Sequence, residues 1–434
     1  MPGLSKRQKA LRDASPYWLA AHGKTEIYYP YIVYRKRAEL LEMLGEWDRA
    51  EDIHRKNLEW LEGHDFRHQA AISRMNLGWL MNRKGRGREA LALLAEADKV
   101  LAECGTEYDR CNVYNKLGNT CYRLGEYRQA EEHFKRSLEM SVHQGDLEQE
   151  ANAENNLGNV YGDLGDIDRA LEHYQKSYRI GEQLHDAYGN AKTAGNLAWC
   201  FFAKGDYPQA MEWYQRQAAV ASQCGDKYLL SLAIGNMVTV FLQEKEYGRA
   251  REAIGRRLDL ARELGDKRGL SVSLSHLSHL QKLEGDLEGA EKSANTAIAL
   301  ARELDARYFL SMFLNERALL LQEMSRTEEA VSSNNEALAI AREMGVAKLV
   351  ADAALLGAKL ATEREEAIEL LQGLRGLVLE PHQAAKVQAE LFRLTGEEEN
   401  RARALELYRE LSVGDGGEEC RAEMEKLSAQ KGRA

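Results

Sequence analysis

The sequence predicts an all-α protein in which about ten helical hairpins stack into a right-handed superhelix. One observation is an alanine that recurs every forty residues, at Ala50, Ala90, Ala130, Ala170, Ala210, Ala250, Ala290 and Ala330. A second is that residues 112–130 and 152–170 repeat one another with the same offset. Self-similarity at this period is typical of a solenoid, because a single hairpin cannot bury its own apolar face.

Composition sets limits on location and partners. The chain has 434 residues, 44% of them hydrophobic, and a formal net charge of −10, which disfavours nucleic acid and anionic membrane surfaces as partners. Residues 1–13 are basic but lack the apolar core of a secretory leader, and no apolar run is long enough to span a membrane. Six cysteines without C-x-x-C spacing indicate a reducing compartment, so we expect a cytoplasmic protein.

In chain order, residues 1–25 form an N-terminal extension and residues 26–380 hold the repeats. A degenerate hairpin, a cap and a charged tail occupy 381–434. The final hairpin is expected over 383–412, after the period shortens and places Ala367 three residues early. Turns within the first eight hairpins are expected near residues 45, 85, 125, 165, 205, 245, 285 and 325.

The turn residues support this assignment. L-G-E at 124–126 and L-G-D at 164–166 place a glycine where a helix ends in the left-handed conformation, followed by an acid that favours the next helix start. The turns at 244–247 and 324–327 have lost the glycine. A second turn, G-D, recurs at 145–146 and joins one hairpin to the next.

The repeat resembles a known family. Tyr114-x2-Leu117-Gly118-x2-Cys121, followed by A-x3-F at 130–134, resembles the tetratricopeptide pattern W-x2-L-G-x2-Y, then A-x3-F. The period of forty residues and the missing final proline are similar to the longer-helix subclass of LGN/Pins spindle adaptors, kinesin light chain and bacterial peptide-sensing regulators. This resemblance implies that the first helix of each hairpin lines a concave surface.

Two neighbouring first helices carry asparagines spaced three and four residues apart. They are Asn112, Asn115 and Asn119 on one helix, and Asn152, Asn155 and Asn159 on the next. Asparagine costs a helix interior about 0.7 kcal/mol relative to alanine, so six of them require a compensating role. A carboxamide pairs with both polar groups of an extended peptide backbone. The alternative is a ladder in which the amides satisfy one another.

Further residues lie on or beside the same helix face, or in its repeat columns, and are assigned to the same groove: Asn76, Trp79, Arg83, Lys116, Arg123, Asn156, Lys192, Asn196, Trp199 and Asn236. Asn76, Asn156, Asn196 and Asn236 occupy a column where the family often places a structural asparagine, so both roles remain open for them. The basic residues make the first half of the groove locally positive, which favours an acidic ligand. The tryptophans anchor ligand side chains or pack only on their neighbours.

These features predict a non-enzymatic interaction scaffold that binds an extended acidic peptide segment of a partner protein. Apolar residues in the later columns, such as Leu232, Val272 and Met312, also suit an amphipathic helix in that partner. A peptide-responsive sensor that changes superhelix shape and a self-associating structural subunit remain alternatives. No nucleophile–base pair is apparent, no cofactor is expected, and His276 and His279 lack further metal ligands nearby.

Overall fold

The computed structural model describes residues 25–64, 66–377, 379–412 and 418–429. Every regular element within these ranges is an α-helix, and the helices pair into ten hairpins followed by one further helix. The all-α hairpin solenoid expected from the sequence is therefore confirmed. Residues 1–24 of the expected N-terminal extension lie outside the described ranges. None of the described helices combines the length and apolar character that crossing a membrane requires.

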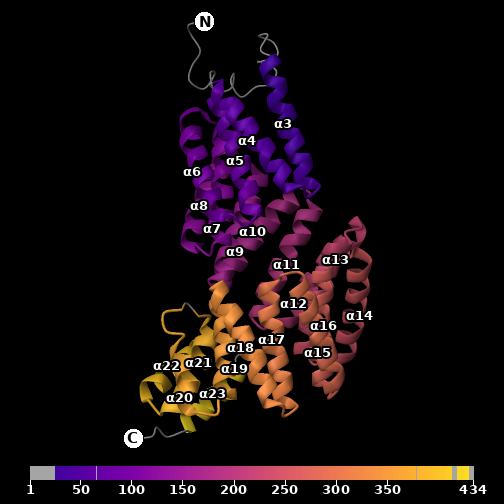
Figure 1. The fold of residues 1–434 in the computed structure, drawn as a ribbon, viewed down its shortest axis with the longest axis vertical. Coiled ribbons are helices and arrows are strands. Elements are labelled where there is room, and N and C mark those ends of the chain that lie inside the picture. Colours follow the sequence, from indigo (N-terminus) through magenta and orange to yellow (C-terminus); the bar gives the residue numbers. More distant parts are fainter. Residues whose placement is uncertain (1–24, 65, 378, 413–417, 430–434) are drawn as a thin grey trace. The chain divides into compact units, whose positions relative to one another are not determined.

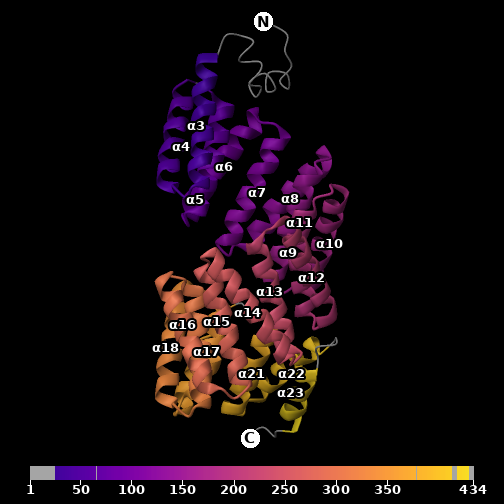
Figure 2. The same cartoon turned by 90° about the vertical axis from the view of Figure 1, so that its right-hand side faces the viewer.

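The chain forms two compact units, Met1–Asp186 (unit 1) and Ala187–Ala434 (unit 2). Figures 1 and 2 show the helices of each unit running antiparallel within their hairpins. Unit 1 contains α3 (Thr25–Met43), α4 (Trp47–Gly63), α5 (Arg67–Arg83), α6 (Gly87–Cys104), α7 (Glu107–Arg123), α8 (Tyr127–Gln144), α9 (Leu147–Asp163) and α10 (Ile167–Gln183).

Unit 2 continues the same alternation. It contains α11 (Ala187–Ala203), α12 (Tyr207–Cys224), α13 (Lys227–Gln243), α14 (Tyr247–Leu264), α15 (Lys267–Leu283), α16 (Leu287–Glu303), α17 (Arg307–Glu323), α18 (Thr327–Met344), α19 (Ala347–Leu360), α20 (Arg364–Gln372), α21 (Pro381–Thr395), α22 (Glu398–Leu411) and α23 (Glu418–Ala429). Helix α22 packs on α21, and Leu427 of α23 is buried against this last hairpin.

The small residues stand where the two helices of a hairpin cross. All eight repeat alanines are fully buried. A Cβ atom on Gly118 would lie 2.6 Å from the ring of Phe134, and a Cβ on Gly158 would lie 2.6 Å from the ring of Tyr174. No larger residue fits at these glycines without moving the aromatic ring. The helices of one hairpin therefore approach closely, as ridges-into-grooves packing requires.

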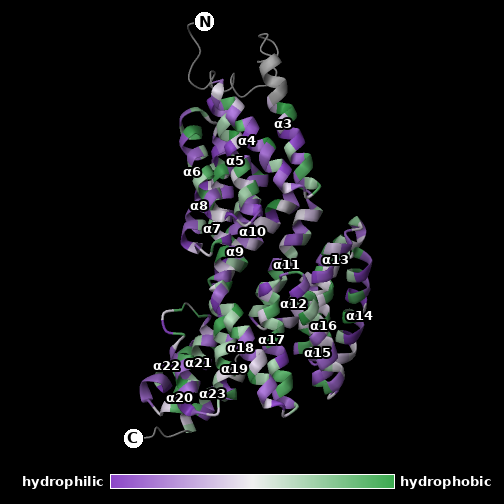
Figure 3. Cartoon of the chain, viewed as in Figure 1, coloured by the Kyte–Doolittle hydropathy of each residue, from purple (hydrophilic) through white to green (hydrophobic). Residues whose placement is uncertain are grey.

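Consecutive helices pack along the whole of each unit, and the odd-numbered helices also contact the odd-numbered helix of the next hairpin. In unit 1, α5 contacts α7 and α7 contacts α9. The odd-numbered helices thus form a layer of their own, which we call the odd-helix layer. Figure 3 shows hydrophilic and hydrophobic residues mixed on the helices throughout. The core is accordingly a series of local clusters, such as Leu94, Leu101, Val113 and Leu117 between α6 and α7.

The expected turns fall where predicted, and they share one backbone conformation even where glycine is absent. Gly45 and Gly125 both have φ +76°, while Lys245 has φ +59° and Ser325 has φ +60°. The side chain makes this left-handed region unfavourable for any residue with a Cβ. Packing of the flanking helices therefore imposes the turn at Lys245 and Ser325 against local preference.

We expect Lys245→Gly and Ser325→Gly each to raise the free energy of unfolding by about 1 kcal/mol, because glycine removes the steric cost of positive φ. The matched control is Gly125→Ser, which should lower it by a similar amount. Urea unfolding followed by circular dichroism measures all three. Unchanged midpoints for both glycine variants would contradict this explanation of the turns.

A charged cluster joins the first two hairpins through Glu51 on α4. Lys84 Nζ donates to Glu51 Oε2 at 2.5 Å, while Arg86 Nη1 and Arg55 Nη2 each donate to Oε1 at 2.8 Å. Burial alone would raise the pKa of Glu51, but the hydrogen bonds from the three basic residues lower it from 4.5 to about 2. The ionised carboxylate is therefore favoured in the folded state.

Because this pKa is lower in the folded chain than in the unfolded chain, its stabilisation is complete above pH 4.5 and is lost as pH falls towards 2. Glu51→Gln should lower the free energy of unfolding by about 2 kcal/mol at pH 7. The difference from the wild type should shrink between pH 4.5 and 2. Glu59→Gln, an exposed site on the same helix, serves as the control. A pH-independent difference would exclude the ionised Glu51 as its cause.

Candidate functional site

Several polar pairs between consecutive odd-numbered helices join residues that are 41 positions apart. In unit 1, Arg83 Nη1 lies 3.2 Å from Glu42 Oε2, and Asn156 Nδ2 donates to Asn115 Oδ1 at 3.1 Å. In unit 2 the same register joins Lys282 to Glu323, with 3.1 Å between Nζ and Oε1. The register exceeds the sequence repeat by one residue, because side chains at staggered positions meet across neighbouring helices.

Three of the predicted asparagines form one hydrogen-bonded cluster, which we call the carboxamide cluster: Asn115, Asn119 and Asn156. Asn119 Nδ2 donates to the Asn115 backbone oxygen at 2.9 Å and to Asn115 Oδ1 at 2.7 Å. Asn115 Oδ1 thus accepts from both neighbours, and the ladder expected as the alternative exists in part. Within the described residues, no hydrogen bond uses Asn115 Nδ2 or the side-chain oxygens of Asn119 and Asn156.

Lys116 lies beside this cluster on α7. Its Nζ is 4.9 Å from the ring centroid of Trp79 on α5, within cation–π range. Burial lowers the pKa of Lys116, and the more distant charge of Glu42 opposes that shift only through space. No carboxylate of the described residues forms an ion pair with Lys116. The lysine is thus a partly desolvated cation without a counter-ion.

Other predicted asparagines serve the helices themselves. Asn112 Nδ2 donates to the backbone oxygen of Tyr108 at 3.0 Å, and Asn112 Oδ1 accepts from Gln149 Nε2 at 3.1 Å. Asn159 Oδ1 accepts from the hydroxyl of Tyr174, a buried residue of α10, at 2.8 Å. Asn155 is partly buried and has a contact within the chain, whereas Asn152 is exposed. Asn159 therefore ties the two helices of its hairpin together.

The predicted positive charge of unit 1 is partly neutralised. Arg83 pairs with Glu42 and lies over the ring of Trp47, with 5.3 Å from Cζ to the ring centroid. Arg123 is exposed at the end of α7, and Asn76 is partly buried on α5. The positive character of this surface thus depends on Lys116 and Arg123.

Four predicted residues belong to unit 2: Lys192, Asn196, Trp199 and Asn236. Lys192 Nζ lies 4.3 Å from the ring centroid of Tyr188 on the same helix. Trp199 is 38% exposed, which leaves much of its ring available. Asn236 is exposed, and Asn196 is partly buried with a contact inside the chain.

Sequence reasoning missed a polar group in unit 2 that comes from an even-numbered helix. Gly195 and Gly235 occupy the repeat positions where α7 and α9 have asparagine. The space that a Cβ atom would take at Gly195 is filled by Gln217 of α12, and at Gly235 by Arg257 of α14. The equivalent residues of the three hairpins before α11 are Ala97, Ser137 and Ser177, and the first hairpin has Asn57 there. The paired change, glycine on the first helix and a long polar residue on the second, was the available signal.

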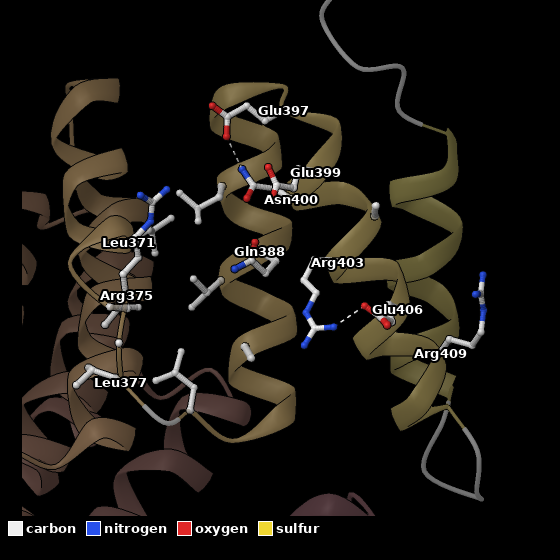
Figure 4. Close-up of a pocket in the computed structure, with 17 residues that line it drawn as sticks. Leu371, Arg375, Leu377, Gln388, Glu397, Glu399, Asn400, Arg403, Glu406 and Arg409 are labelled. Atoms are coloured by element: carbon white, nitrogen blue, oxygen red, sulfur yellow. Dashed lines mark hydrogen bonds and ion pairs between the residues drawn. The ribbon is translucent and has the colours of Figure 1, made fainter.

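A cavity of about 990 Å³ lies at the C-terminal end of unit 2. Figure 4 shows Leu371, Gln388 and Arg403 around it, contributed by α20, α21 and α22. Polar groups at its rim pair with each other, since Arg403 donates to Glu406 and Asn400 donates to Glu397. None of the predicted groove residues lines it. No group of three or more potential metal-ligating side chains occurs among the described residues, those around His276 included.

The small-residue columns and the hairpin stack define a helical repeat protein. Family models named tetratricopeptide repeat match residues 111–141 and 149–223. The chain contains tetratricopeptide repeats, as the resemblance implied. A model named anaphase-promoting complex subunit 5 also matches residues 199–284, 242–315 and 301–362. No curated protein matches the chain.

Solved structures with a similar fold include bacterial proteins. The apo form of the quorum sensor NprR from B. thuringiensis is 18% identical with a TM-score of 0.58, over 72% of this chain and 86% of that one. Aspartyl phosphate phosphatase F from Bacillus subtilis is 14% identical with a TM-score of 0.55, over 78% and 96%. A Rap protein complexed with competence and sporulation factor is 16% identical with a TM-score of 0.52, over 73% and 98%. At these identities the likeness establishes the fold alone.

The two kinds of asparagine should respond differently to truncation. Asn159→Ala removes the acceptor of the Tyr174 hydroxyl and should lower the free energy of unfolding by about 1–2 kcal/mol. Asn152→Ala changes an exposed residue and should raise it by about 0.5 kcal/mol through helix propensity. Urea unfolding of both variants measures the contrast. Equal effects would show that the hydrogen bond to Tyr174 contributes nothing to stability.

Proposed function

We propose that this protein is an interaction module that binds an extended peptide segment of a partner protein on the odd-helix layer of unit 1. The observation that carries the proposal is Lys116, a partly desolvated cation held over Trp79 without a counter-ion. A cation in this setting favours a ligand that supplies a negative charge. An acidic side chain of the bound segment meets that requirement.

The carboxamide cluster supplies the second requirement for an extended ligand. Asn115 Nδ2 is a donor, and the side-chain oxygens of Asn119 and Asn156 are acceptors, all without a hydrogen bond among the described residues. Because Asn115 Oδ1 holds both neighbours in place, these groups are oriented before a ligand arrives. A preorganised set of donors and acceptors loses less entropy on binding a peptide backbone.

The similar folds support a peptide ligand, since one protein binds competence and sporulation factor and another is a quorum sensor. They also favour a second candidate function, in which peptide binding changes the shape of the chain. Small-angle scattering with and without a bound peptide separates the two: a scaffold keeps its radius of gyration and a sensor changes it. Another protein of similar fold is a phosphatase, so the lack of catalytic activity stays a prediction. Self-association also stays one, to be measured by sedimentation.

The binding test begins with selection of random dodecapeptides displayed on phage against the intact chain. Synthetic versions of the enriched peptides are then titrated by fluorescence anisotropy. We expect acidic residues to be enriched and Lys116→Met to weaken binding about tenfold or more, because methionine keeps the apolar stem and removes the charge. Asn115→Ala should also weaken binding, since it removes one donor and the acceptor that positions Asn119 and Asn156.

Lys99→Met on α6 is the matched control, because Lys99 is exposed on an even-numbered helix. Its affinity for the selected peptides should equal that of the wild type. Circular dichroism verifies that every variant keeps its helicity. Enrichment of no peptide, or equal affinities for Lys116→Met and Lys99→Met, would refute the proposed site.

A further inference from the structure

Arg257 on α14 is a buried cation whose guanidinium forms no hydrogen bond or ion pair with the residues that the structure describes. The residue is 6% exposed, and its Nε and Nη1 atoms are buried without a hydrogen bond. Burial lowers the pKa of Arg257, and Asp266 and Tyr228 oppose the shift only through their distant charges. A buried charge without hydrogen bonds is costly, so an unpaired arginine requires an explanation.

The guanidinium of Arg257 reaches the odd-helix layer because Gly235 has no side chain to block it. A Cβ atom on Gly235 of α13 would lie 2.4 Å from Arg257 Cζ and 2.7 Å from Nη1. The equivalent positions on α7 and α9 are Asn115 and Asn155, forty residues apart in the repeat. The guanidinium therefore occupies the place that belongs to an odd-helix side chain in unit 1, where Asn115 faces the proposed peptide surface.

The neighbouring group is His276 of α15, which follows Gly235 by 41 residues, as Asn156 follows Asn115. Burial, together with the charges of Arg257 and His279, lowers the pKa of His276 to about 3. The ring is therefore neutral near pH 7 and adds no second positive charge. Its Nδ1 is buried and has no hydrogen-bond partner.

Three acidic residues of the surrounding helices are already engaged. Asp266 caps α15 by accepting from the Gly269 amide at 2.9 Å. Glu316 of α17 accepts a hydrogen bond from Ser275, and Glu284 pairs with Arg251. The described residues thus supply no carboxylate to Arg257.

We propose that Arg257, beneath Gly235 and beside His276, forms a binding site for a carboxylate, supplied by the C-terminus or an acidic side chain of a peptide. A guanidinium offers parallel N–H donors that match the two oxygens of a carboxylate. The neutral imidazole of His276 adds a donor or an acceptor at the same place. This site lies wholly in unit 2, so a test of it does not depend on the result for the Lys116 site in unit 1.

The test titrates the intact chain with defined carboxylate probes at constant ionic strength. The probes are N-acetyl-trialanine with a free C-terminus, the same peptide amidated, and an amidated N-acetyl peptide with one glutamate. The readout is the ¹H–¹⁵N signal of Arg257 Nε, assigned from its absence in Arg257→Gln. We expect saturable shifts with the free terminus, the glutamate side chain or both, and none with the amidated trialanine peptide.

Two matched variants verify the assignment. Because Arg257→Gln lacks the Nε signal, the affinity of every variant is followed through the backbone amide signals of α13. Arg256→Gln removes the adjacent, exposed arginine and should leave probe affinity unchanged, while Arg257→Gln should lower it about tenfold or more. If Arg257→Gln fails to fold, Gly235→Ala provides the second test, because the added Cβ displaces the guanidinium and should also weaken binding. A signal that does not respond to either carboxylate, that responds equally to chloride, or that prefers inorganic phosphate overturns the proposal.

Discussion

The structure depends on the close approach of the two helices in each hairpin at small residues. Gly118 and Gly158 leave room for the rings of Phe134 and Tyr174, and the repeat alanines are fully buried at the same level of the stack. Because these small residues leave space on one helix for the large side chains of the other, the two helices interlock, which fixes the hairpin spacing. That spacing determines which odd-helix side chains face each other 41 residues apart.

The functional proposals follow from which charged side chains of the odd-helix layer are paired and which are not. Most charges that approach one another are paired, as Arg83 is with Glu42. Lys116 and Arg257 are different because neither forms an ion pair with the described residues. Each is positioned by a different neighbour. Lys116 lies over Trp79, whereas Arg257 passes beneath Gly235 from an even-numbered helix. In both cases the described residues supply no ion-pair partner, which is why we propose that each cation binds an external anion.

Turn positions could be predicted because they depend on local chemistry, with glycine in the left-handed conformation at Gly45 and Gly125. Lys245 and Ser325 show that the flanking helices impose the same turn without glycine. The candidate site was less predictable. Asn112 and Asn159 shared the expected spacing with Asn115, yet Asn159 bonds to Tyr174 inside its hairpin. Helical periodicity assigns a residue to a face, but it does not identify which neighbouring helix supplies its partner.

The sequence by itself determined the repeat length, the helical hairpins and their turns, because these follow from side-chain size and backbone preference at regular spacing. Only the tertiary structure decided which polar groups are paired, since pairing depends on a stagger between helices that belongs to neither sequence repeat alone. Arg257 is the clearest case: its side chain starts on one helix and ends in a space left by Gly235 on another. The sequence of either helix alone does not show that the Arg257 side chain reaches the space at Gly235, because this contact exists only once the two helices are packed.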